Sequence, residues 1–79
     1  MSENSFHPGI FLQELLIWQR IEPADLAAKT GIAENEIVDI TLQRRGIDEA
    51  ISRDLAEYFG NSARFWMHLQ QSFDSRSAP

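Results

Sequence analysis

Proline and glycine divide this 79-residue chain at regular intervals, and their spacing constrains the fold more than any other feature. His7-Pro8-Gly9 opens one segment, Pro23 opens the next and Gly31 closes it, and Gly46 and Gly60 interrupt the later chain. Proline suits the first turn of a helix, and glycine suits the position just after the last turn. The punctuation therefore predicts short helices joined by tight turns.

Apolar residues repeat with helical spacing between these breaks. In the first segment Phe11, Leu15 and Trp18 follow one another at helical intervals, and Leu12 and Leu16 widen the stripe. The later segments carry similar stripes, and Asp48 and Ser62 are suitable N-caps. Helices are therefore predicted from His7-Pro8-Gly9 onward, over about residues 23–30 and 34–42, from Asp48 to Phe59, and from Ser62 onward.

The segment from Ile37 to Leu42 permits a second interpretation. It is rich in β-branched residues, which favour strands. Helical segments flank it, however, and no partner strand is recognisable elsewhere in the chain. We therefore predict an all-α domain of five helices.

Length and composition narrow the functional classes. A chain of 79 residues forms one small, marginally stable domain, and such domains often dimerise. The absence of cysteine excludes disulfides, thiol nucleophiles and cysteine-based zinc sites. No apolar run is long enough to span a membrane and no signal peptide is recognisable, so we expect a cytoplasmic protein. The polar ends, residues 1–5 and 75–79, are expected to be flexible around a domain over 6–74.

A group of small and branched residues lies around Gly31. Ala27 precedes this glycine by four positions, and Ile37 and Ile40 follow it by six and nine. A small residue permits close approach of two helices, and glycine tolerates the turn between them. Leu26, Ile32, Ile37 and Ile40 would fill the angle. This arrangement, over about residues 23–42, is typical of a DNA-binding helix-turn-helix.

Several motifs also resemble one family over about residues 6–74. They are His7-Pro8-Gly9, Glu14-Leu15-Leu16, Asp25-Leu26-Ala27, Arg44-Arg45-Gly46-Ile47, Leu55-Ala56-Glu57-Tyr58-Phe59-Gly60 and Phe65-Trp66-Met67-His68-Leu69-Gln70. The chain is similar to HigA/VapI-type antitoxins of the lambda-repressor-like (XRE) helix-turn-helix class. The resemblance implies a homodimer that binds a palindromic operator on double-stranded DNA, represses its own promoter and neutralises a RelE-like (HigB-type) ribonuclease toxin.

The expected recognition helix departs from this family. Where the family carries basic or amide groups, this chain has Glu34, Asn35 and Glu36, followed by Asp39, and only the pair Arg44-Arg45 matches. Carboxylates oppose the phosphate field, although glutamate can accept from cytosine and asparagine can pair with adenine. Equally, Glu34 and Glu36 can simply stabilise the helix N-terminus. The candidate DNA-binding residues are Glu34, Asn35, Glu36, Val38, Gln43, Arg44 and Arg45.

The last predicted helix is more apolar than a terminal helix needs to be. We expect Phe59 and Phe65 in the core, and a shared core and dimer-interface role for Trp66, Leu69 and Phe73. The family resemblance implies dimerisation through this region. His7 is expected in the turn that opens the first helix, and His68 at the surface. No catalytic constellation, metal site or cofactor motif is recognisable, so an enzyme is not expected.

Two functional hypotheses follow. The first is a HigA-like antitoxin that represses its own promoter, with Arg44 and Arg45 contacting phosphate. The second is a protein-binding module on a helix-turn-helix scaffold with weak or lost DNA binding, whose acidic helix meets a basic surface such as that of a toxin. DNA binding itself distinguishes the two.

Overall fold

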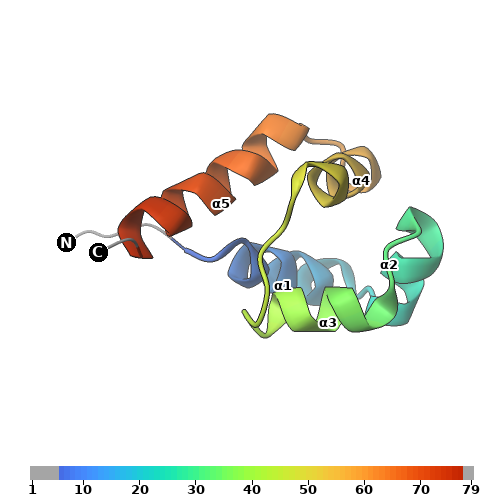
Figure 1. Cartoon of the computed structure of the whole chain (residues 1–79). Coiled ribbons are helices and arrows are strands. Elements are labelled where there is room, and N and C mark those ends of the chain that lie inside the picture. Colours follow the sequence, from blue (N-terminus) through green and yellow to red (C-terminus); the bar gives the residue numbers. More distant parts are fainter. Residues whose placement is uncertain (1–5, 78–79) are drawn as a thin grey trace.

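The computed structural model describes residues 6–77, and these form five α-helices (Figure 1). The helices are α1 (Pro8–Gln19), α2 (Pro23–Thr30), α3 (Glu34–Thr41), α4 (Glu49–Phe59) and α5 (Ala63–Ser77). The described part of the chain contains no strand. The predicted all-α, five-helix fold is confirmed, and the strand interpretation of Ile37–Leu42 is wrong because α3 covers this segment up to Thr41.

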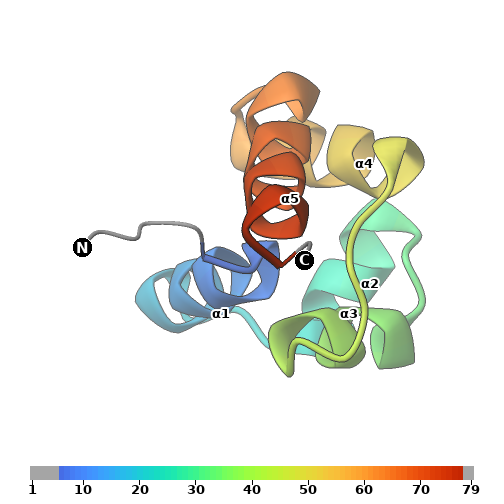
Figure 2. The same cartoon turned by 60° about the vertical axis from the view of Figure 1, so that its left-hand side comes forward.

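The five helices form two groups. In both views α4 and α5 lie together on one side of α1, α2 and α3, and the loop 42–48 connects the groups (Figures 1 and 2). The far end of α5 approaches the beginning of α1 (Figure 2). The N-terminal group thus contains the predicted helix-turn-helix, and α5 lies against its first helix.

Side chains begin three of the helices as predicted. His7 Nδ1 accepts a hydrogen bond from the Gly9 amide at 2.8 Å. Asp48 Oδ1 accepts from the Ile51 amide at 2.9 Å, and Ser62 Oγ accepts from the Phe65 amide at 3.0 Å. Each bond satisfies an amide that has no partner inside its helix. The sequence therefore specifies these three helix starts locally.

Helices α1 and α3 pack with unusually close backbones at Gly9. A Cβ atom at this position would collide with the carbonyl oxygen of Ile40. Only glycine permits this approach. The Pro8-Gly9 pair thus serves two purposes, because proline starts α1 and glycine lets α3 lie directly against that start.

One hydrophobic core joins all five helices. Its members are Leu12, Leu16, Leu26, Ile32, Ile37, Ile40, Ile47, Ile51, Leu55, Ala56 and Trp66. Trp66 is the largest fully buried side chain. Its ring lies near those of Phe11, Phe59 and Phe65. The core therefore changes character from aliphatic residues between α1, α2 and α3 to aromatic ones beside α5.

Two sequence-based predictions about side-chain burial need correction. Trp18, assigned to the apolar stripe, is 82% exposed. Helix α1 is apolar on several sides, and only the side that packs on α3 and α5 is covered. Phe65, expected in the core, is 38% exposed at the core's edge, and Tyr58 is similarly exposed. Periodicity identified these helices but not which apolar residues face inward.

The C-terminal boundary also differs from the prediction. Helix α5 continues through residues 75–77, which were expected to be flexible. No proline or glycine interrupts the sequence between Gly60 and Pro79, so nothing in this stretch ends the helix early. The expected flexible residues 1–5 and 78–79 lie outside the described residues.

Candidate nucleic-acid interface

The turn between α2 and α3 has the geometry of a helix-turn-helix. Leu26, Ile37 and Ile40 are fully buried between the two helices, and Gly31 adopts a left-handed φ of 84°. Thr30 Oγ1 donates to the Leu26 carbonyl at 2.7 Å and accepts from the Ile32 amide at 3.2 Å. The apolar residues predicted to fill the angle between the helices do so. The two hydrogen bonds of Thr30, which were not predicted, connect the end of α2 to the turn.

All seven predicted DNA-binding residues lie on α3 or the loop that follows it, so the structure places them along one edge of the domain. Glu34, Asn35, Gln43 and Arg44 are exposed, whereas Glu36, Val38 and Arg45 are partly covered. Leu42, which was not predicted, is 52% exposed beside them. We refer to α3 and the loop 42–48 as the recognition edge.

The chain reverses direction at Gln43, directly after α3. Gln43 has a left-handed φ of 62°, its amide donates to the Ile40 carbonyl, and the Arg44 amide donates to the Asp39 carbonyl at 2.8 Å. These two bonds form a Schellman motif, in which glycine usually occupies the left-handed position. The turn directs the chain back along α3 and so places both arginines near the carboxylates of the helix.

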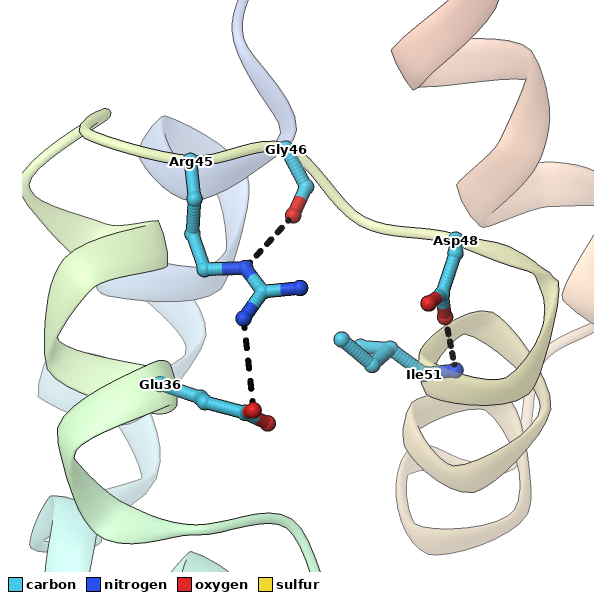
Figure 3. Close-up of polar contacts among 5 residues, drawn as sticks. All are labelled: Glu36, Arg45, Gly46, Asp48 and Ile51. Carbon is cyan, nitrogen blue, oxygen red and sulfur yellow. Dashed lines mark hydrogen bonds and ion pairs between the residues drawn. The ribbon is translucent and has the colours of Figure 1, made fainter.

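Each arginine forms an ion pair with a carboxylate of α3. Arg45 Nη1 lies 3.3 Å from Glu36 Oε2, and Arg45 Nε also donates to the Gly46 carbonyl at 3.3 Å (Figure 3). Arg44 Nη1 lies 3.7 Å from Asp39 Oδ1. The acidic helix and the basic pair, separate features in the sequence, therefore partly neutralise one another in the fold.

Helix α5 supports the loop that carries these arginines. Gln70 Oε1 accepts from the Ile47 amide at 2.8 Å, while Gln70 Nε2 donates to Asp74 Oδ1 at 2.9 Å. A Cβ atom on Gly46 would lie 2.5 Å from the Gln70 oxygen, so glycine permits the close contact. Gln70 was not among the predicted site residues, because no local pattern in the sequence links it to a loop more than twenty residues earlier.

His7 lies near the same loop. The centroid of its buried ring lies 4.9 Å from that of Phe73, in an edge-on contact, and the ring lies near the backbone of Arg45. Burial lowers the pKa of His7 from its ordinary value of 6.5, while the Arg45 backbone and the charge of Asp74 oppose this shift. A neutral ring also suits the bond from Gly9, because Nδ1 must be unprotonated to accept it.

Chains with known structures share this architecture. The Pseudomonas aeruginosa antitoxin HigA, solved with its higBA promoter, is 35% identical, with a TM-score of 0.89 over 94% of this chain and 82% of that chain. A HigA-family addiction module antidote protein from Coxiella burnetii is 30% identical, with a TM-score of 0.83 over 91% of this chain and 79% of that one. This chain belongs to the HigA antitoxin family.

The wider comparisons agree with membership of the HigA family. Virulence-associated protein I of Dichelobacter nodosus is 29% identical over 75 residues, which are 94% of this chain and 69% of that protein. No protein-family model matches the chain. The predicted resemblance to HigA/VapI-type antitoxins and the predicted helix-turn-helix fold are therefore confirmed, and the relatives of this HigA-family chain are antitoxins rather than enzymes.

Two further structural findings concern metal sites and membrane-spanning helices in this HigA-family chain. Within residues 6–77, no three His, Asp or Glu side chains gather closely enough to hold a metal ion. None of the helices described is both long and apolar enough to cross a membrane. His7 opens α1 and His68 is exposed, as predicted.

The three predicted dimer residues of this HigA-family chain differ in accessibility. Trp66 is fully buried within the single chain, and its Nε1 donates to Asn61 Oδ1 at 2.7 Å. It therefore has no exposed area to contribute to a partner, and the shared role predicted for it reduces to a core role. Leu69 and Phe73 are only partly buried, so both retain surface that a second copy can cover.

Proposed function

We propose that this chain is a DNA-binding antitoxin that represses its own promoter. The observation that carries the proposal is the placement of Arg44 and Arg45 directly after α3, within a fold like that of a HigA solved with promoter DNA. Lysine and arginine contacts to phosphate supply much of the affinity of such proteins for DNA. The two arginines are the only basic residues on the recognition edge.

The proposed complex contains two copies of the chain on a palindromic operator. A dimer formed through the exposed parts of Leu69 and Phe73 on α5 would place two copies of α3 in successive major grooves, about 34 Å apart. Asn35 is suited to adenine, and Glu34 or Glu36 to the amino group of cytosine. Val38 offers an apolar contact to a thymine methyl, and Gln43 a further polar contact.

The second proposed partner is a RelE-like (HigB-type) ribonuclease toxin. Membership of an antitoxin family supports this partner. The chain has a formal net charge of −5, which favours association with a basic protein. Both activities take place in the cytoplasm under this proposal.

The test measures binding to DNA from directly upstream of the gene by fluorescence anisotropy. Wild-type protein should prefer this duplex to a scrambled one, at about 50 and 200 mM salt. Replacing both Arg44 and Arg45 by alanine should weaken binding and reduce the slope of log K against log salt by about 0.9 for each lost phosphate contact.

The matched control replaces Arg53 and Arg64, two exposed arginines outside the recognition edge, by alanine. It removes the same charge and should change the salt slope less. An unchanged slope in the Arg44/Arg45 double variant would remove these residues from the phosphate contacts. Weak binding of the wild-type protein to both duplexes would favour the protein-binding module, because it would mean that the acidic α3 does not bind in the major groove of DNA.

A further inference from the structure

The ion pairs of the recognition edge have an unusual position for a DNA-binding surface. Glu36 and Asp39 are three residues apart and therefore lie on one side of α3. The Schellman motif at Gln43 turns the following arginines back toward that side. The cations available for phosphate are consequently held by carboxylates of the recognition helix itself.

Arg45 can also exchange Glu36 for another partner. Both side chains retain about two-fifths of their accessible surface, 41% for Glu36 and 38% for Arg45. Ion pairs this exposed contribute little to stability and are screened by salt. Arg45 remains anchored through its Nε bond to the Gly46 carbonyl, so Nη1 can change partner without release of the whole side chain (Figure 3).

We propose that Glu36 is a specificity-determining residue that competes with DNA phosphate for Arg45. On any duplex, an Arg45–phosphate contact through Nη1 replaces the Arg45–Glu36 contact and leaves the carboxylate in the negative field of the DNA. On the operator, the released carboxylate accepts a hydrogen bond from a cytosine amino group. On other DNA it has no such compensation. The inference rests on the proposed function and assigns Glu36 the discrimination between operator and other DNA.

The experiment compares Glu36→Gln with Glu34→Gln on operator and scrambled duplexes. Both substitutions remove one negative charge from the first turn of α3, but Glu34 has no ion pair with another described residue. Glu36→Gln should bind scrambled DNA about two- to fivefold more tightly than Glu34→Gln does, the factor expected for loss of one exposed ion pair. Its preference for the operator should also fall, because the neutral amide oxygen of glutamine accepts more weakly from the cytosine amino group than the carboxylate does.

A double-mutant cycle assigns the effect to the pair. In an Arg45→Gln background, Glu36→Gln and Glu34→Gln should have equal effects on scrambled DNA, because the competing cation is gone. Thermal unfolding by circular dichroism confirms that every variant remains folded at the temperature of the titration.

Equal effects of Glu36→Gln and Glu34→Gln in the wild-type background overturn the inference, as does an excess that persists without Arg45. Either result leaves the proposed function intact, provided that the wild-type protein prefers its operator. Failure of the wild-type protein to bind the operator overturns both. The two conclusions are thus tested by different measurements, since one depends on wild-type selectivity and the other on the difference between two variants.

Discussion

The recognition edge and the aromatic cluster of this protein are held together in opposite ways. The recognition edge, α3 and the loop 42–48, depends on exposed or half-exposed polar contacts such as Arg45–Glu36 and Arg44–Asp39. The aromatic cluster consists of Phe11, Phe59, Phe65 and Trp66, and it depends on buried apolar area. The first kind of contact is easily exchanged for another partner, whereas the second is not. Binding and stability are therefore located in different parts of the same small domain.

Trp66 shows what the aromatic cluster contributes. Its ring centroid lies 5.4 Å from that of Phe11, 6.0 Å from that of Phe59 and 5.8 Å from that of Phe65. These residues come from α1, α4 and α5, so one side chain joins the two groups of helices. The hydrogen bond from Nε1 to Asn61 satisfies the one polar atom of the indole.

The two tryptophans provide the strongest test of this contrast. Trp66→Ala should lower the free energy of unfolding by about 3–5 kcal/mol, the usual cost of truncating a buried aromatic residue. For a domain this small, such a loss approaches the whole stability. Urea unfolding followed by circular dichroism measures the change.

Trp18→Ala is the matched control, because it makes the same substitution on an exposed side chain. Its free energy of unfolding should change by no more than about 0.5 kcal/mol. Similar losses for the two variants would mean that the aromatic cluster does not dominate the stability, and the contrast between the two regions would fail.

The sequence predicted the elements of both regions better than their contacts. Pro23, Gly31 and Asp48 act on their immediate neighbours, so their positions revealed where helices begin and end. The exposure of Trp18 could not be predicted, because it depends on which side of an apolar helix the other helices cover. The support of Ile47 by Gln70 was also inaccessible, since it is a long-range contact without a periodic signal.

The candidate DNA-binding site shows the same limit. The sequence identified Glu36 and Arg45 as separate residues with conflicting charges. Their pairing follows from the left-handed turn at Gln43. No glycine occupies this position, so the turn could not be predicted from the sequence. The fold thus pairs two opposite charges that the sequence shows only as separate residues.

His7 lies between the recognition edge and Phe73 of α5, and it provides the second test. Its neutral form caps α1, lies near the Arg45 backbone and packs on Phe73. Because burial lowers the pKa of His7 below 6.5 in the folded chain, the unfolded chain binds protons more readily. The contribution of neutral His7 to the free energy of unfolding should be fully present above pH 6.5. It should decline as the pH falls from 6.5 toward the lower pKa of His7 in the folded chain.

Urea midpoints at closely spaced pH values from about 7.5 down to 5.5, a range that brackets the ordinary histidine pKa, measure this decline. His7→Asn retains an oxygen that can cap α1 but cannot titrate, so it should flatten the profile while costing up to about 2 kcal/mol. His68→Gln, which removes the exposed histidine, should leave the decline intact. A decline that survives in His7→Asn but disappears in His68→Gln would reverse the assignment.

The smallest expected effect concerns the strained turn of the recognition edge. Gln43 occupies a left-handed conformation that costs a non-glycine residue about 1–2 kcal/mol. Glycine adopts it freely but loses more entropy on folding, so Gln43→Gly should increase the free energy of unfolding by about 0.5–1 kcal/mol. Urea unfolding should show a higher midpoint, while operator binding should weaken if the Gln43 side chain contacts DNA.

The reverse exchange at the end of α4 completes this comparison. Gly60 has a φ of 79°, and a Cβ atom added there would meet open space, so Gly60→Gln should suffer the conformational cost without a steric clash. Its free energy of unfolding should fall by about 1 kcal/mol, opposite in sign to the change at Gln43. Opposite signs would mean that glycine, the residue favoured in a left-handed conformation, occupies the turn beside the aromatic cluster. Beside the proposed DNA-binding arginines the backbone strain at Gln43 is retained, because a side chain is useful there. Equal signs would show that the turn at Gln43 is relaxed, and the position of Arg45 over Glu36 would then need no strain to maintain it.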